Sequence, residues 1–194
     1  MSARQPWADP TQFQVRVAGP HDRDRVARFL AAMDRDGLYE RHFAHGEAPN
    51  LALLRRIEAL DQRERVAVLA VGHDGEVLGH GEYVAEHGAA EFALMVLPLF
   101  RVRGIGRRLL RALLEIAAAA GQSEMHGIIQ ASNTRALQLV RNSGFRLVPG
   151  EDRTTVIASR PLSPSQSLPF IRHDPDRTPL HRRLGPGAPL RAGG

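Results

Sequence analysis

Apolar and polar positions repeat with two different periods along the chain, and these periods predict its secondary structure. Residues 13 to 18 alternate apolar and polar side chains, which is typical of a strand. Residues 21 to 36 place Val26, Phe29 and Met33 three and four positions apart, which is typical of an amphipathic helix. The same reasoning predicts strands at 66–72, 77–84, 90–97, 125–131, 145–148 and 154–158, and helices at 51–60, 107–120 and 134–142.

The order of these elements predicts the fold class. Asp74-Gly75 separates two strands and is typical of a hairpin turn, and the glycines within 77–84 indicate a bulge or a close backbone approach. A strand and two helices are followed by three strands, and helices and strands then alternate. We therefore expect an α+β domain whose mixed, mostly antiparallel sheet of about six to seven strands is flanked by about four helices.

Composition along the 194 residues predicts one folded domain with two loose ends. The domain is expected to run from 13 to 160. Residues 1–12 are polar and contain two prolines, so they are expected to be a flexible N-terminus. Residues 161–194 are rich in Pro, Arg and Gly without any periodicity, and we expect a disordered tail there.

The segment from 91 to 116 carries the clearest candidate for a binding site. A predicted strand breaks at Pro98, glycines follow at 104 and 106, and a long apolar helix begins directly afterwards. The first N–H groups of a helix have no internal partner, so a glycine turn at this place attracts anions. Four arginines add positive charge around the turn: Arg101, Arg103, Arg107 and Arg108. We therefore expect a phosphate-bearing ligand, with an ordinary strand-to-helix turn as the alternative.

Composition narrows the classes of function. The chain has no cysteine, which excludes disulfides, zinc–thiolate sites and cysteine nucleophiles. It has no apolar run close to the roughly 18 residues of a membrane span and no apolar signal core, so a cytoplasmic protein without membrane contact is expected. No metal is expected either, because His42, His45 and His87 lack ligand spacing. All 26 basic residues are arginine, but only 5% of residues are aromatic, so we expect no nucleic-acid partner.

Two motifs resemble those of the GNAT superfamily of N-acetyltransferases. Arg101-Val-Arg-Gly-Ile-Gly106 matches the family signature Arg/Gln-x-x-Gly-x-Gly/Ala. Asn133-x-x-Ala136, followed by Asn142-Ser-Gly-Phe145, resembles a second recurrent stretch in which an Asn opens a helix that ends in Gly-Phe. The resemblance covers the predicted domain and implies the GNAT fold, in which a splayed pair of parallel strands forms the acyl-CoA slot.

The resemblance implies acetyl-CoA as co-substrate. The cofactor's pyrophosphate would bind backbone N–H groups of the glycine turn, and its pantetheine arm would pair with the preceding strand as if it were another strand. Asn133 would contact the arm. The implied cofactor-binding residues are Leu94, Met95, Val96, Arg101, Val102, Arg103, Gly104, Ile105, Gly106, Arg107 and Asn133.

Transfer to an amine needs a neutral amine, whereas a free lysine has a pKa of about 10.4, so a general base is useful. The resemblance to protein acetyltransferases implies Glu91 for this role; a solvated carboxylate at the strand end is the alternative. Many family members carry a Tyr seven residues after the motif Asn to protonate the leaving thiolate, but here that residue is Val140. Other candidate acids or bases, each with a structural or surface role as its alternative, are His80, Glu82, Tyr83 and His126.

Residues 38–43, 60–70 and 90–94 are similar to the GNAT domain of bacterial protein lysine acetyltransferases of the Pat type. This similarity implies direct attack by a protein lysine in a ternary complex, with an acyl-CoA synthetase as one possible protein partner. It also implies that three residues line the acceptor side, where ordinary packing is the alternative: Tyr39, Arg41 and Phe43. A monomer or a homodimer is expected.

Other functions stay open at this stage. A small-molecule amine acetyltransferase and a non-catalytic acyl-CoA-binding regulatory module fit the same cofactor motif. A dinucleotide-binding turn would need a third glycine at position 109, which is Leu. A nucleic-acid-binding protein would depend on the arginine charge alone.

Overall fold

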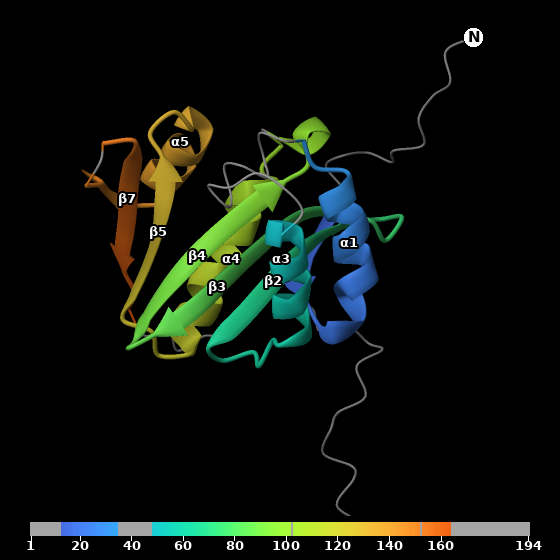
Figure 1. Ribbon diagram of the computed structural model, residues 1–194. Helices are drawn as coiled ribbons and strands as arrows, with labels where there is room; N and C mark the ends of the chain where they lie inside the picture. Colours follow the sequence, from blue (N-terminus) through green and yellow to red (C-terminus); the bar gives the residue numbers. More distant parts are fainter. Residues whose placement is uncertain (1–12, 35–47, 102, 152, 164–194) are drawn as a thin grey trace, which may run out of the picture.

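The computed structural model describes residues 13–34, 48–101, 103–151 and 153–163 (Figure 1). Seven strands form one sheet in the order β1-β2-β3-β4-β5-β7-β6, and every neighbouring pair is antiparallel except β4 and β5. This arrangement confirms the predicted α+β class and the mixed, mostly antiparallel sheet. The strands are β1 Phe13–Val17, β2 Arg65–Gly72, β3 Val77–Glu86, β4 Ala89–Val96, β5 Glu124–Gln130, β6 Arg146–Pro149 and β7 Thr155–Pro161.

Helices cover both faces of the sheet. They are α1 Arg23–Ala31, α3 Ala48–Glu58, α4 Ile105–Ala119 and α5 Thr134–Asn142, with short 3-10 turns η1 Pro20–Asp22 and η2 Pro98–Phe100. In Figure 1, α1 and α3 lie in front of the sheet and α4 lies behind it. Each face has its own apolar core: α1 and α3 pack with Leu69 and Met95, whereas α4 and α5 pack with Phe92 and Phe145.

Two glycines on β3 let α4 pack directly on the sheet. A Cβ atom at Gly79 would lie 2.9 Å from Ile105 Cγ2, and one at Gly81 would lie 3.2 Å from Leu113 Cδ1, both on α4. The register between β2 and β3 also shifts between Ala70 and Val71, as it does at a bulge. The glycines predicted a bulge or a close approach, and the structure has both: a register shift between β2 and β3 and a close approach of α4 to β3.

Several element ends differ from the prediction. The first helix ends at Ala31, because the N–H of Met33 bonds the carbonyl of Leu30 in a tighter 3-10 pattern. Helix α3 begins at Ala48 and ends at Glu58, whereas the prediction was 51–60. The last strand extends to Pro161 because β5 continues to pair with it there.

A buried ion pair fixes the start of α1. The Asp22 carboxylate is fully buried, and the Arg16 guanidinium donates to both of its oxygens at 2.8 and 2.6 Å. The backbone N–H of Gly19 and the side chain of Arg25 also donate to it. Burial raises the pKa of Asp22, but the hydrogen bonds and charge of Arg16 outweigh that effect and, with the Gly19 N–H, lower the pKa to about 2.

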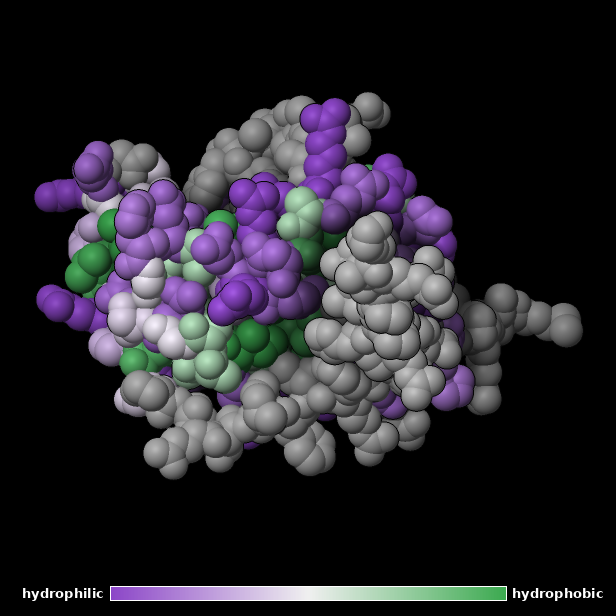
Figure 2. All heavy atoms as spheres, turned by 90° about the horizontal axis from the view of Figure 1, so that it is seen from below, coloured by the Kyte–Doolittle hydropathy of each residue, from purple (hydrophilic) through white to green (hydrophobic). Residues whose placement is uncertain are grey.

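Large apolar side chains are exposed at few places in the described part of the chain. Among the coloured residues that are visible from below Figure 1, most are hydrophilic and a smaller area is hydrophobic (Figure 2). Two of the exposed apolar side chains, Ile128 on β5 and Ile157 on β7, are paired in register. None of the described helices is long and apolar enough to cross a membrane.

Candidate functional site

The two parallel strands pair over only three positions and then separate. Ala89, Ala90 and Glu91 of β4 pair with residues 124–126 of β5. Beyond Glu91, β4 continues to Val96 alongside β3, whereas β5 continues alongside β7. The sheet therefore opens between β4 and β5 in the way that the predicted splayed pair requires.

The backbone of β4 presents hydrogen-bonding groups to this opening. The N–H of Leu97 donates to the carbonyl of Leu78 on β3 at 3.0 Å. In an antiparallel ladder the direction of backbone groups alternates, so Met95 also points its N–H and C=O at β3. Leu94 and Val96 point theirs the other way, into the opening. This is the edge that pairing with an extended pantetheine arm needs.

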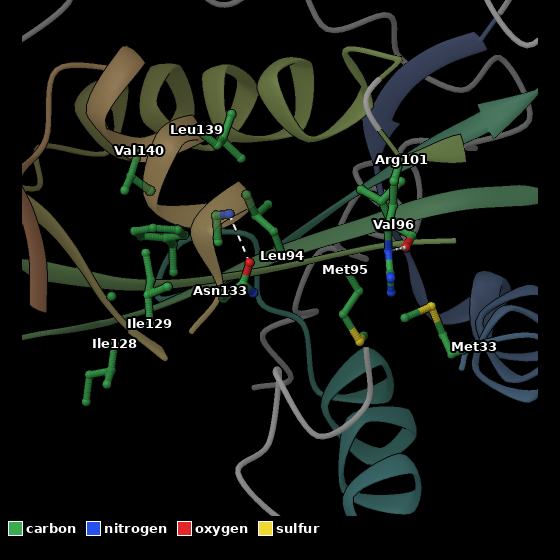
Figure 3. Close-up of a pocket in the computed structure, with 13 residues that line it drawn as sticks. Met33, Leu94, Met95, Val96, Arg101, Ile128, Ile129, Asn133, Leu139 and Val140 are labelled. Carbon is green, nitrogen blue, oxygen red and sulfur yellow. Dashed lines mark hydrogen bonds between the residues drawn. The ribbon is translucent and has the colours of Figure 1, made fainter. Parts of the chain in front are cut away.

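Two adjoining cavities occupy the opening, with volumes of about 130 and 360 Å³. Figure 3 shows the smaller one, with Met33 and Met95 towards one end and Leu139 and Val140 of α5 towards the other. Since Met95 packs with α1 and α3 on one face of the sheet while α5 lies on the other, this cavity passes through the sheet. Both cavities are lined by Leu94, Met95, Val96, Arg101, Asn133, Ala136 and Leu139.

The larger cavity reaches the glycine turn. Gly104 precedes α4 with φ +83°, a backbone conformation that favours glycine. Gly106 faces α5, because a Cβ atom there would lie 3.3 Å from Leu139 Cδ2. Arg107 lines this cavity together with Arg135 of α5, and neither forms an ion pair with another described residue. The turn therefore has the free N–H groups, the space and the positive charge of an anion site.

The other arginines near the turn are arranged differently. The Arg108 guanidinium lies 4.4 Å from the centre of the Phe13 ring and donates to the Phe13 carbonyl, so it is directed to β1. Arg103 is exposed, 6.0 Å from the centre of the Phe100 ring. Arg135 was missed from the sequence, although it follows the motif residue Asn133 by two positions on a predicted helix.

Arg101 is held by neighbours in the protein. Its two Nη atoms donate to the Asp34 carboxylate at 3.2 and 2.8 Å, and its Nε donates to the Val96 carbonyl at 3.3 Å. The sequence led us to expect charge for the pyrophosphate from Arg101 or Arg103. Because Asp34 already neutralises Arg101, Arg107 and Arg135 are better placed to supply that charge.

The remaining predicted cofactor residues fall into three groups. Asn133 lines both cavities and also caps α5, since its Oδ1 accepts from the N–H of Ala136 at 3.0 Å. The side chains of Met95 and Ile105 are buried, which leaves mainly their backbone groups for a ligand. Val102 lies outside the described residues.

Glu91 is exposed at the last paired position of β4, and His126 is its register partner on β5. By strand parity, the Glu91 side chain lies on the same face of the sheet as Met95, where the smaller cavity ends. Glu91 does not itself line either cavity; at about 3.3 Å per residue it lies roughly 10 Å along the strand from Leu94.

Among the other candidate acids and bases, two are buried on the same face as Glu91. Glu82 pairs in register with Ala93, is 5% exposed and lies 3.4 Å from the Arg56 guanidinium. His80 is fully buried. On the opposite face, Tyr83 donates to the Arg63 carbonyl, and burial and the charge of Asp61 raise the pKa of Tyr83 to about 12, which supports a structural role.

Three predicted acceptor-side residues, Tyr39, Arg41 and Phe43, lie outside the described residues. Val140, at the position where many GNAT enzymes have a Tyr, is 1% exposed and lines the smaller cavity. Within the described ranges, no group of three or more His, Cys, Asp or Glu residues is placed to hold a metal ion.

Comparison with known proteins identifies the family of this fold. The family model described as acetyltransferase (GNAT) matches residues 29–145, which is more than half of the chain. The chain belongs to this acetyltransferase family. An acetyltransferase of Pseudomonas aeruginosa is 25% identical over 157 residues, which cover 78% of this chain and 84% of that protein. A mycothiol acetyltransferase of Clavibacter michiganensis is 39% identical over 80 residues, but these cover 41% of this chain and only 26% of the relative.

Solved structures confirm the GNAT fold. The GNAT domain of S. lividans PAT superposes with a TM-score of 0.71 at 21% identity, covering 77% of this chain and 90% of that domain. The acetyltransferase yncA from Salmonella typhimurium, solved with acetyl-CoA, superposes with a TM-score of 0.63 at 16% identity, covering 81% of this chain and 98% of its own. The sequence resemblance to the GNAT superfamily is thus confirmed.

Proposed function

We propose that this GNAT acetyltransferase transfers an acetyl group from acetyl-CoA to a primary amine, and that the amine is a protein lysine. The observation that carries the proposal is the pair of adjoining cavities between β4 and β5: the smaller passes through the sheet, and the larger reaches the glycine turn. A cofactor with its phosphates at the turn would present its thioester within the opening.

Acetyl-CoA fits the groups that line this path. The N–H groups at the start of α4, with Arg107 and Arg135, would hold the pyrophosphate. The gap-facing N–H groups of Leu94 and Val96 and the carbonyl of Leu94 would pair with the amides of the pantetheine arm, while the Val96 carbonyl accepts from Arg101. The acyl end would then lie towards Met33 and Met95, on the face that carries Glu91.

The proposed reaction is a direct attack in a ternary complex. The amine nitrogen bonds to the thioester carbonyl carbon, and the resulting oxyanion accepts a hydrogen bond from a gap-facing N–H such as that of Leu94. Collapse breaks the carbon–sulfur bond and releases the coenzyme A thiolate. Since Val140 has no proton to give, the thiolate takes its proton from solvent.

Glu91 is the proposed base that removes the amine proton. Its distance along the strand from Leu94 means that a water molecule would relay the proton. Glu82 lies closer to Leu94 than Glu91 does, since its register partner is Ala93, but it is buried and paired with Arg56. We therefore assign Glu82 to holding the acceptor side in shape and Glu91 to proton removal.

A protein lysine is favoured as acceptor by the likeness to the S. lividans PAT domain and by the sequence similarity to the Pat type. An acyl-CoA synthetase is one such protein. The second candidate is a small-molecule amine, which is favoured by the likeness to a phosphinothricin acetyltransferase from Sinorhizobium meliloti (TM-score 0.63, 21% identity, 80% of this chain and 95% of that one).

A panel of acceptors tests the proposal. Purified protein is incubated with labelled acetyl-CoA and, separately, with lysine peptides, acyl-CoA synthetases, polyamines and aminoglycosides, and product is identified by mass spectrometry. We expect ε-acetyl-lysine on a protein or peptide. Transfer only to small amines would establish the second candidate, and cofactor binding without any transfer would establish a non-catalytic module.

A further inference from the structure

Asp34, in the segment that follows the end of α1 at Ala31, contacts the beginning of the cofactor motif, 67 positions further along the chain. Its two carboxylate oxygens accept from the two Nη atoms of Arg101 at 2.8 and 3.2 Å. The same guanidinium donates through Nε to the Val96 carbonyl. One arginine therefore connects the end of α1 to the end of β4.

This connection lies at the wall of the cavity. Arg101 lines both cavities, and Met33, the neighbour of Asp34, lines the smaller one. Figure 3 shows the Arg101 side chain beside Val96 and directed towards Met33. The side chain is only 23% exposed, and that of Asp34 is 37% exposed, so the pair is partly shielded from water.

The geometry separates two roles that an arginine in this motif can have. An arginine that binds the phosphates should direct its guanidinium towards the glycine turn, where the helix N–H groups bind the same phosphates. Arg101 instead uses its planar fork on a carboxylate and its Nε on a backbone carbonyl. That carbonyl belongs to Val96, whose backbone groups face the opening between β4 and β5.

We propose that Asp34 is a positioning residue that, through Arg101, clamps the end of α1 to the end of β4 and so fixes the wall where the acyl group and the acceptor amine meet. This inference rests on the proposed function. Loss of the clamp leaves the phosphate-binding turn in place but loosens Val96 and Met33. Rates of group transfer are sensitive to shifts of about 1 Å, so the transfer step suffers more than cofactor binding does.

Four variants test the clamp: Asp34→Asn, Arg101→Gln, the double variant, and Arg101→Lys. The acetyl-CoA Kd, kcat and acceptor KM are measured for each. Asp34→Asn is expected to keep the acetyl-CoA Kd within about threefold and to lower kcat at least about tenfold. Arg101→Lys should behave like Arg101→Gln, because an ammonium group cannot reproduce the three-way contact. The double variant should lose little more than Arg101→Gln alone, because the two residues act as one unit.

Glu115→Gln on α4 is the matched control, since it breaks another arginine–carboxylate pair, with Arg111, and neither residue lines a cavity. It should leave kcat and Kd unchanged. The clamp is refuted if Asp34→Asn keeps kcat within twofold of wild type, or if its Kd weakens as much as kcat falls. Tighter acetyl-CoA binding with a higher kcat would also refute it, since Asp34 would then merely compete with phosphate for Arg101.

A readout without catalysis keeps the clamp separate from the proposed function. Solvent exchange of the Arg101 Nε–H, followed by NMR, should be at least about tenfold faster in Asp34→Asn than in wild type. If wild type shows no transfer at all, the proposed function fails while this signal still decides the clamp. Equal exchange rates in the two proteins would show that Asp34 does not hold Arg101.

Discussion

Glu91 and Glu82 lie on the same face of the sheet but in opposite environments, and single substitutions can separate their roles. Glu91 is exposed at the point where β4 and β5 part, whereas Glu82 is buried against Arg56. A base must exchange protons with solvent during each cycle, which an exposed carboxylate does readily. A buried, paired carboxylate is better suited to holding structure.

For Glu91→Gln we expect kcat to fall at least about 100-fold, because the amide cannot accept the amine proton. The acetyl-CoA Kd should change less than about twofold, since Glu91 lines neither cavity. Steady-state kinetics measure kcat, and calorimetry measures the acetyl-CoA Kd. Glu86→Gln, an exposed glutamate on the neighbouring strand, is the control and should behave as wild type. A wild-type kcat in Glu91→Gln would remove Glu91 as base, and a fall of the same size in Glu82→Gln alone would transfer the role to Glu82.

Asp22 makes folding stability depend on pH. Its pKa is about 2 in the folded protein, against 3.8 for an aspartate side chain free in water, so the folded state favours the carboxylate. The resulting stability is fully present above pH 3.8 and is lost as the pH falls towards about 2. Asp22→Asn should cost about 3 kcal/mol at pH 7, because it leaves Arg16 without its buried partner. Urea unfolding of wild type and Asp22→Asn at pH 7 and at pH 3 measures the loss of stability at each pH. An equal loss at the two pH values would contradict the role assigned to the Asp22 carboxylate.

At the scale of elements, the glycine turn and the facing helix α5 together make the larger cavity. Gly106 sits between them, with Leu139 Cδ2 at 3.3 Å and Val96 Cγ2 at 3.9 Å from the place where a Cβ atom would lie. A branched side chain at this position would therefore project into space that the cofactor needs.

We expect Gly106→Val to weaken acetyl-CoA binding at least about tenfold, which is about 1.4 kcal/mol. Ala119→Val introduces the same side chain at an exposed position of α4. It is the matched control and should bind acetyl-CoA as wild type does. Calorimetric titration with acetyl-CoA measures the affinity of both variants. Unchanged affinity in Gly106→Val would mean that the cofactor does not pass between α4 and α5.

The sequence predicted the elements well because each carried its own local signal. Alternation marked the strands, the Asp-Gly turn marked the β2–β3 hairpin, and Asn133 marked the start of α5. Contacts between distant segments carried no such signal. The Asp34–Arg101 pair and the place of Arg135 at the cavity depend on how α1 and α5 pack, which periodicity does not report.

At the scale of the whole molecule, the sheet order explains why the site lies where it does. β4 and β5 are the one parallel pair among the described strands, and they belong to two halves that are covered by different helices. Because the halves part beyond Glu91, the opening has the backbone groups of β4 on one wall, and its other walls combine apolar side chains with Asn133 and several arginines. Recognition of the GNAT motifs predicted the family and its fold, which are confirmed, whereas the residues that bind the cofactor stay a prediction and the predicted acceptor-side residues lie outside those described.

The most direct test of this account is amide exchange along β4, resolved by residue with NMR, with and without acetyl-CoA. Leu94 and Val96 direct their N–H groups into the opening, whereas Met95 between them directs its own to β3 and serves as an internal control. We predict that acetyl-CoA slows exchange at Leu94, at Val96 or at both, and leaves Met95 unchanged. Binding of acetyl-CoA without added protection at either gap-facing amide would contradict the claim that the opening between β4 and β5 is the acyl-CoA site.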